Sequence, residues 1–466
     1  MPRAAAVCGL LLIAAFRAHS VPAVQDAAPA SRLEALRVRA NGRVLETVTG
    51  RRFFYLADTA WELVHRATRE EIDWYLETRA AQGFTAVQVV LLPEINGPDM
   101  PNAYGQVPLV DRDPDRPNDK YFALVDHIVR AADRHGLYVA LLPTWGAYVV
   151  SEQHPLFASP RIFDAAGARR YGRYLGARYR AEPNVIWVLG GDRSAGGYEA
   201  VWQAMASGLR EAGQGAPRKL ISYHPNGGES SSRWFASADW IDFHMLQSGH
   251  RRDSRPYEMV AEDYARRPVK PVLNGEPGYE GIPDTLSSTG AKLDDEDVRR
   301  FAYWSVFSGA FGHTYGANEV WMMWSPALEP LTPKVKPPFL GARRTWRDAV
   351  ATYPGAQQMR HLRALFDRAD RIARVPAQHL LDEPSAGGLH HVAAIAGEDR
   401  SWAYVYIPAA APAPRIRISG LRASRLSARW YNPRTGNEME SLTIEDRVSP
   451  LRAVPPDTQD WVLQLE

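Results

Sequence analysis

Short apolar runs alternate with amphipathic stretches over the first three quarters of the chain. Eight runs have the length of buried strands, beginning near residues 53, 84, 137, 184, 219, 240, 269 and 309. Most are separated by helical patterns, one of which opens on a capping box at Thr68 and Glu71 and ends at Gly83. Strands joined by helices pair in parallel through right-handed crossovers. The pattern predicts an α/β fold, a (β/α)8 TIM barrel over residues 33–370.

The pattern changes after this region. Short strand-like runs occur near residues 391, 402, 415, 426 and 461, with turn signals between them such as Thr435-Gly436. Strands at this spacing are typical of a small antiparallel β-sandwich, which we place at residues 371–466. A further Asn41-Gly42 pair between alternating runs predicts a hairpin ahead of the barrel.

The first 20 residues resemble a secretory signal peptide. Arg3 supplies the positive start, residues 4–16 are apolar, and small residues follow. The apolar part is too short to span a membrane, and residues 21–32 are an Ala- and Pro-rich linker. The one cysteine, Cys8, lies in the signal segment, so we expect a secreted or periplasmic protein without disulfides.

Composition narrows the class of partner. The net charge of +2 has no basic run behind it, which argues against a nucleic-acid partner. The 14 Trp and 20 Tyr suit the faces of sugars, although large aromatics are also ordinary core residues. No glycine-rich nucleotide fingerprint follows the first strand, and no sequence feature indicates a cofactor. The composition leaves the oligomeric state open.

Candidate site residues follow the strands, because the carboxyl ends of barrel strands converge on one face. The residues that we expect to bind a substrate there are Asp58, Trp61, Glu94, Trp145, His224, His244, His313, Tyr315 and Trp321. The tryptophans could form stacking walls, with ordinary packing as the alternative. Three histidines on one rim also raise a metal hypothesis, but no spaced ligand cluster such as H-E-x-x-H supports it. We therefore predict no metal.

Two carboxylates follow glycines at the ends of predicted strands. Asp192 comes after Gly190-Gly191 at the fourth strand, and Glu276 after the seventh. Hydrolysis of a glycosidic bond requires one acid for the leaving oxygen and one carboxylate for the sugar carbon. We assign Asp192 as the acid/base and Glu276 as the nucleophile. Either acid alone could instead cap a helix or pair with an arginine, and Arg193 would oppose a raised pKa at Asp192 if it turns inward.

Four motifs in order carry a resemblance to a known family. Residues 54–63, 185–192, 273–280 and 312–316 resemble the apiosidase-like catalytic domains, glycoside hydrolase family 140 and its unassigned relatives. The resemblance covers roughly residues 33–365. It implies a retaining exo-glycosidase with an Asp and a Glu as catalytic pair, acting on β-apiofuranosyl branches of the pectin rhamnogalacturonan II. The related clan usually has Asn-Glu after the fourth strand, where this chain has Gly191-Asp192.

Several alternatives stay open at this point. The enzyme could be another exo-glycosidase, such as an arabinofuranosidase or a galactosidase. The barrel could be an inactive carbohydrate-binding protein, or a metal-dependent hydrolase that a chelator would inhibit. The C-terminal part resembles a small sandwich often named a collagen-binding domain, and we expect it to pack against the barrel. In each case an oligo- or polysaccharide is the expected partner.

Overall fold

A computed structural model describes residues 33–150, 160–287, 290–327, 339–368, 374–422, 425–445 and 450–466. The predicted signal peptide, the linker and Cys8 lie outside these ranges. The description therefore begins at the predicted hairpin, which is formed by β1 (Leu36–Val38) and β2 (Leu45–Thr47).

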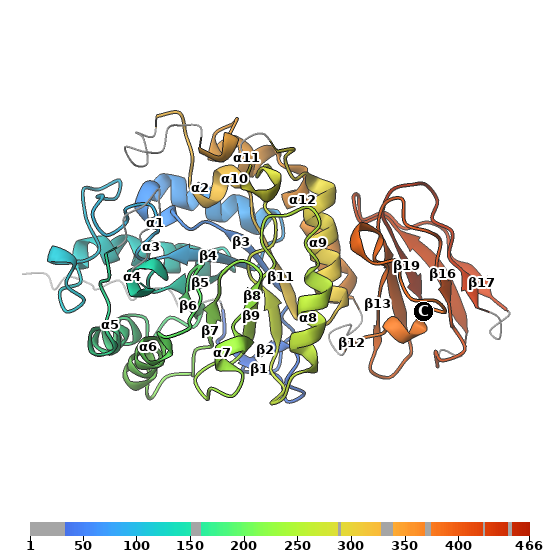
Figure 1. The fold of residues 1–466 in the computed structure, drawn as a ribbon, viewed down its shortest axis with the longest axis horizontal. Helices are drawn as coiled ribbons and strands as arrows, with labels where there is room; N and C mark the ends of the chain where they lie inside the picture. Colours follow the sequence, from blue (N-terminus) through green and yellow to red (C-terminus); the bar gives the residue numbers. More distant parts are fainter. Residues whose placement is uncertain are drawn as a thin grey trace, which may run out of the picture. The chain divides into compact units, whose positions relative to one another are not determined.

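A nine-stranded sheet forms the centre of the larger domain, in the order β7-β6-β5-β4-β3-β11-β10-β9-β8 (Figure 1). Its eight parallel strands are β3 (Tyr55–Thr59), β4 (Ala86–Val90), β5 (Tyr138–Leu142), β6 (Val185–Gly190), β7 (Ile221–His224), β9 (His244–Gln247), β10 (Val272–Asn274) and β11 (Gly312–Tyr315). The short β8 (Glu229–Ser230) runs antiparallel to β9. The barrel is nearly closed where β7 approaches β9, and the Asp242 N–H donates to the Ile221 carbonyl there at 2.8 Å. Each of the eight predicted strands is present, and the TIM-barrel prediction is confirmed.

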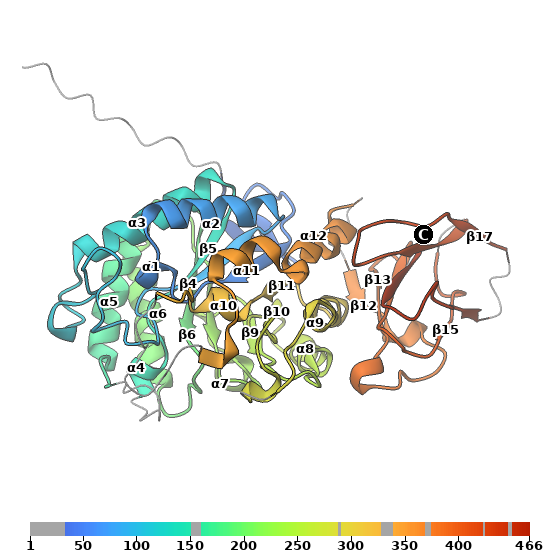
Figure 2. The same ribbon diagram turned by 90° about the horizontal axis from the view of Figure 1, so that it is seen from above.

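Helices cover the outer face of this sheet, as Figures 1 and 2 show for α2, α3, α5 and α6. The longer ones are α2 (Arg69–Ala81), α3 (Asp119–Arg134), α5 (Ala165–Arg178), α6 (Glu199–Ala212), α8 (Pro256–Ala265), α9 (Asp295–Phe307), α11 (Trp346–Thr352) and α12 (Pro354–Asp367). Single turns are α1 (Leu63–Arg66), α4 (Ala147–Val150), α7 (Ser232–Phe235) and α10 (Asn318–Trp321). The predicted capping box of α2 is present, since Thr68 accepts from the Glu71 N–H and Glu71 from the Thr68 N–H. The helical stretch at the end of the barrel domain is divided into two helices, because Pro354 cannot continue α11 and starts α12.

The pleat of the barrel strands decides which side chains reach the interior. Residues paired across neighbouring strands share a face, and the face alternates along each strand. Tyr55 packs edge-on against Phe311, which in turn contacts Phe243, in the interior. Counting from Tyr55 puts Thr59 inside and Asp58 outside, and the register carries this parity around the barrel.

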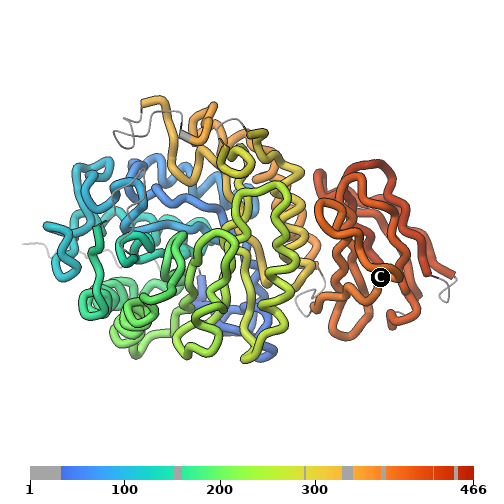
Figure 3. The backbone as a smooth tube through the Cα atoms, viewed as in Figure 1, coloured from blue at the N-terminus to red at the C-terminus, as the bar shows by residue number. Residues whose placement is uncertain are grey.

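The C-terminal region is an antiparallel sheet domain, as predicted. The order of the larger sheet is β12 (Arg374–Pro376), β13 (Ala393–Gly397), β14 (Ala403–Ile407), β19 (Trp461–Leu465), β16 (Leu426–Tyr431) and β17 (Leu442–Ile444). A second pair is β15 (Arg415–Ile416) with β18 (Leu451–Arg452). Figure 3 lets the path be followed from the barrel into this sheet, in orange and red.

Both faces of the strand β14 in the larger sheet are buried. Along β14, Val405 and Ile407 belong to a core shared with Ile416 of β15, whereas Tyr404 and Tyr406 belong to the core of the barrel domain. The Tyr406 ring stacks on Tyr303 of α9 at a centroid distance of 4.8 Å. The sheet therefore completes the apolar cover of α9 as well as its own sandwich.

Among the described residues, no helix has both the length and the apolar composition needed to cross a bilayer.

Candidate active site

The carboxyl ends of the barrel strands bring the predicted catalytic pair to one face. Asp192 follows β6 and Glu276 follows β10. The chain reaches Asp192 through three residues with left-handed backbone: Gly190, Gly191 and Asp192, with φ of +85°, +122° and +48°. A Cβ on Gly191 would lie 2.7 Å from the Trp145 ring. Only glycine fits there, so the backbone directly before Asp192 can pack against the Trp145 ring.

Two imidazoles hold the Glu276 carboxylate. His224 Nε2 lies 2.9 Å from Oε2, and His250 Nε2 lies 3.1 Å from Oε1. Burial alone would raise the pKa of Glu276, but the hydrogen bonds and charge of the two histidines outweigh it and lower the pKa to about 2. The group is therefore ionised, as a nucleophile must be.

His224 also contacts both predicted catalytic residues. Its Nδ1 lies 3.2 Å from the backbone N–H of Asp192 and 3.0 Å from the carbonyl of Pro225. Its Nε2 faces Glu276 from the other side of the ring. One side chain thus joins the ends of β6, β7 and β10.

The pKa of Asp192 is shifted in the opposite direction to that of Glu276. Burial and the negative charge of Glu276 raise its pKa, while Arg193, His224 and a hydrogen bond from Gln247 oppose that rise. A third of its side chain is exposed. A carboxyl whose pKa is raised and which also reaches solvent is suited to act as a general acid.

Arg193 turns inward. Its Nη1 donates to the Asp192 carbonyl at 2.6 Å and lies 3.2 Å from the Asp192 carboxylate, while Nη2 lies 3.4 Å from Glu94 Oε1. Glu94 is therefore part of the site. Burial raises the pKa of Glu94 to about 7. The negative charges of Asp192 and Glu62 also raise it, whereas the positive charge of Arg193 lowers it.

Aromatic rings line the site beside the carboxylates. Trp61 packs edge-on against Trp145 and against His224, at a centroid distance of 5.5 Å in both cases. The Trp61 indole N–H donates to the Tyr279 hydroxyl at 3.1 Å, and the Tyr279 ring lies 4.5 Å from that of His250. Trp61, Trp145 and His224 therefore lie together beside the predicted catalytic pair. Their role in substrate binding stays a prediction.

Two predicted substrate residues face away from the site. Asp58 is fully buried on the outer parity of β3, where its Oδ2 accepts from Arg79 at 2.7 Å and from Tyr75 at 2.6 Å, both on α2. Tyr315 pairs with Asp58 across the strands and donates to Glu280 at 2.6 Å. The prediction for both is corrected, because their side chains point from the sheet to the helices.

The other two histidines are also misplaced by the prediction. His244 begins β9, so it lies at the amino end of the strand, where Lys270 and Arg266 add to the burial that lowers its pKa to about 3. His313 pairs with the outward Leu56, and burial lowers its pKa to about 3. Neither side chain joins His224 at the rim.

Trp321 lies next to the segment that follows β3 and carries Trp61 and Glu62. Its carbonyl accepts from the Glu62 N–H at 3.0 Å, and it is nearly buried. Its role in substrate binding stays a prediction. Across the described residues, no group of three or more His, Cys, Asp or Glu is arranged to hold a metal ion.

Sequence reasoning missed Gln247, His250 and Tyr279. Gln247 is the last residue of β9, one residue beyond the end of the predicted strand. A prediction that extended this strand by one residue would have included Gln247 among the strand-end candidates. His250 lies 26 residues before Glu276. No local pattern signals that contact, which requires the loop after β9 to fold over the end of β10.

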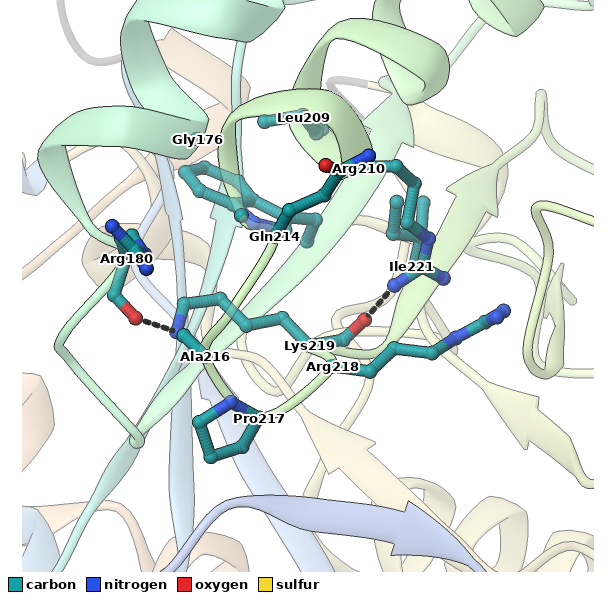
Figure 4. Close-up of a pocket in the computed structure, with 12 residues that line it drawn as sticks. Gly176, Arg180, Leu209, Arg210, Gln214, Ala216, Pro217, Arg218, Lys219 and Ile221 are labelled. Carbon is teal, nitrogen blue, oxygen red and sulfur yellow. Dashed lines mark hydrogen bonds between the residues drawn. The ribbon is translucent and has the colours of Figure 1, made fainter.

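A separate cavity lies elsewhere in the barrel domain (Figure 4). It encloses about 220 Å³ between α5, α6 and the start of β7, and Arg180, Arg210, Arg218 and Lys219 are among its lining residues. Lys219 donates to the Arg180 carbonyl at 3.1 Å, and Arg210 donates to the Lys219 carbonyl. The cavity is near the amino end of β7, so it is distinct from the face with Asp192 and Glu276.

Comparisons with known proteins agree with this geometry. The family described as "Apiosidase-like, catalytic domain" matches residues 39–372, and the one described as "Putative collagen-binding domain of a collagenase" matches residues 375–466. No curated protein matches the chain.

Two solved structures are similar over nearly the whole length. A structure described as a glycoside hydrolase family 5 from Bacteroides vulgatus is 30% identical with a TM-score of 0.82, covering 92% of this chain and 93% of that one. A second, described as a glycoside hydrolase, is 31% identical with a TM-score of 0.80, covering 93% and 96%. The chain belongs to the apiosidase-like family and is a glycoside hydrolase.

Proposed function

We propose that this enzyme is a retaining exo-glycosidase that removes a branch sugar from plant cell-wall polysaccharide. The observation that carries the proposal is that the surroundings shift the pKa values of two carboxyls on one barrel rim in opposite directions. The pKa of Asp192 is raised by burial and by Glu276, and that of Glu276 is lowered by two imidazoles. An environment that separates two carboxyls in this way assigns the acid and the nucleophile.

The reaction proceeds in two steps. Glu276 attacks the anomeric carbon as Asp192 gives its proton to the departing glycosidic oxygen, so one C–O bond forms on the enzyme and the other breaks. In the second step a water oxygen attacks the same carbon, and the bond from that carbon to Glu276 breaks. Asp192, now a carboxylate, takes a proton from this water. His224 and His250 hold the nucleophile during both steps.

We propose β-D-apiofuranose of rhamnogalacturonan II as the sugar. Support comes from the family described as apiosidase-like and from the paired indoles of Trp61 and Trp145 beside the carboxylates. Indoles beside the carboxylates suit contact with the face of a sugar.

The test uses aryl β-apiofuranoside, α-arabinofuranoside, β-galactoside and β-glucoside with wild type, Asp192→Ala and Glu276→Ala. Wild type should cleave the apiofuranoside, and both variants should lose that activity. The first-formed product, followed by NMR, should retain its anomeric configuration. Inversion, or an unchanged rate in Glu276→Ala, would refute the nucleophile assignment.

Other outcomes point to the alternatives. Cleavage of the arabinofuranoside or the galactoside would keep the mechanism and change the sugar. If no aryl glycoside is cleaved, digestion of pectin fragments decides between a strict need for the natural leaving group and a carbohydrate-binding protein without catalysis.

We also propose that the protein is exported. Arg3 followed by the apolar residues 4–16 supports this. Sequencing the amino terminus of the protein from its native host should show cleavage near residue 20, and an intact Met1 would contradict the proposal.

A further inference from the structure

Arg193 joins two carboxyl groups that belong to different strands. One end of its guanidinium lies 3.2 Å from Asp192 Oδ2 and the other lies 3.4 Å from Glu94 Oε1. All three side chains are at least partly buried, with 10% of Arg193, 15% of Glu94 and 33% of Asp192 exposed. In such a setting charges interact more strongly than in water.

The surroundings fix this arginine. The Tyr223 hydroxyl donates to the Arg193 carbonyl at 2.8 Å, and Gly146 lies so close that a Cβ there would be 2.8 Å from Arg193 Cβ. The Glu94 backbone is fixed as well, because the Tyr148 hydroxyl donates to the carbonyls of Pro93 and Glu94 at 2.7 and 3.2 Å. The backbones of both Arg193 and Glu94 are therefore fixed by their neighbours.

This arrangement poses an electrostatic problem for the proposed acid. A cation 3.2 Å from Asp192 favours the carboxylate, yet the proposed first step needs the protonated form. His224 and the Gln247 hydrogen bond act in the same direction as Arg193. Glu276 opposes them from β10, and Glu94 faces Arg193 from the end of β4.

We propose that Glu94 is a positioning residue for the acid/base: it holds Arg193 and offsets its charge, so that Asp192 keeps its proton for the leaving oxygen. The inference rests on the proposed function. One guanidinium faces two carboxyls, so the three groups are neutral together when the pair retains one proton. Glu62 adds a further negative charge near Glu94 from the segment after β3.

The test is Glu94→Gln, which keeps the shape of the side chain and removes its charge. It is assayed over a pH series with two glycosides of the sugar that wild type cleaves. One has an alkyl leaving group that needs protonation, and the other has a dinitrophenyl group that does not. The quantity compared is kcat/KM, which reports on cleavage of the glycosidic bond.

For the alkyl glycoside, we expect Glu94→Gln to lose about tenfold in kcat/KM above pH 7, where Glu94 is ionised in the wild type. The basic limb of its profile should move down by about one pH unit, since Arg193 is then uncompensated beside Asp192. The dinitrophenyl glycoside should be cleaved at nearly the wild-type rate. Glu94→Asp should recover part of the lost activity.

The outcomes separate the possible roles. An equal loss with both leaving groups would overturn the inference and indicate that Glu94 binds a sugar hydroxyl or supports the fold. An unchanged profile would overturn it too. If wild type cleaves neither glycoside, the proposed function has failed instead. Asp99→Asn, which breaks the exposed pair with Arg112, is the matched control and should match wild type.

Discussion

Individual side chains at this rim act through the groups that they hold. Glu276 has one imidazole for each carboxylate oxygen, and burial would otherwise favour its protonated form. His250 comes from a loop, whereas His224 is the last residue of a barrel strand. The loop histidine can therefore be removed with less effect on the barrel.

His250→Ala should raise the pKa of Glu276, because the variant loses one of the hydrogen bonds that oppose the effect of burial. Glu276 must be ionised to attack, so a higher pKa moves the acidic limb of kcat/KM to higher pH. We expect a shift of about one unit or more, with activity partly restored toward neutral pH. A pH–rate profile measures this. His379→Ala, an exposed histidine of the C-terminal domain, should leave the limb in place, and an unmoved limb in His250→Ala would contradict the role.

At the scale of the element, the pleat of each strand divides polar residues into two sets. His224 and Gln247 project inward at strand ends and meet the catalytic carboxyls. Asp58, Tyr315 and His313 project outward. Asp58 contacts Arg79 of α2, Tyr315 donates to Glu280, and His313 is buried between the sheet and the helices. A one-residue change in where a strand starts would exchange these sets.

His313→Leu tests this division. The imidazole is buried with neither nitrogen hydrogen-bonded within the described part of the chain, and burial keeps it neutral. Replacing an unsatisfied polar group with an apolar one of similar size should leave the free energy of unfolding unchanged or raise it by about 1 kcal/mol. Urea unfolding measures this, and kcat/KM should match wild type. His224→Leu makes the same change on the inward face and should lose activity; a comparable loss in His313→Leu would contradict the assignment of faces.

At the scale of the molecule, the C-terminal sheet is part of the barrel's support. Arg299 of α9 makes a bidentate pair with Asp460 at 2.7 and 2.9 Å, and both side chains are buried. Asp460 also accepts from Arg434 and Tyr406. The Trp304 indole donates to the His391 carbonyl at 2.7 Å. These contacts join α9 to several strands of the sheet.

Asp460→Asn should destabilise both domains together. It leaves Arg299 buried without its bidentate partner, which typically costs about 3–5 kcal/mol. Calorimetry should show the unfolding transitions of barrel and sheet domain moving down together. Asp367→Asn removes a partly exposed pair with Arg363 on α12 and should change stability by less than about 0.5 kcal/mol. A barrel transition that stays in place in Asp460→Asn would show that the domains unfold independently.

Local patterns in the sequence were sufficient to locate the elements and to nominate Asp192 and Glu276 as candidate catalytic residues. Apolar runs, a capping box and helix-ending glycines depend on neighbours along the chain, so all eight barrel strands and the main helices could be located. Asp192 and Glu276 follow glycines at strand ends, and a family motif marks both. The antiparallel C-terminal sheet followed from the spacing of its strands.

Tertiary structure alone decided which polar residues meet. The sequence does not state the pleat of a short, fully apolar strand, because residues on both faces are buried when helices cover the sheet. Asp58, His244, His313 and Tyr315 were therefore assigned to the wrong surroundings. The approach of His250 to Glu276 and of Arg193 to Glu94 depends on loops from different strands meeting at one rim. Contacts between residues far apart in the chain leave no periodic signal, so only the folded barrel could reveal them.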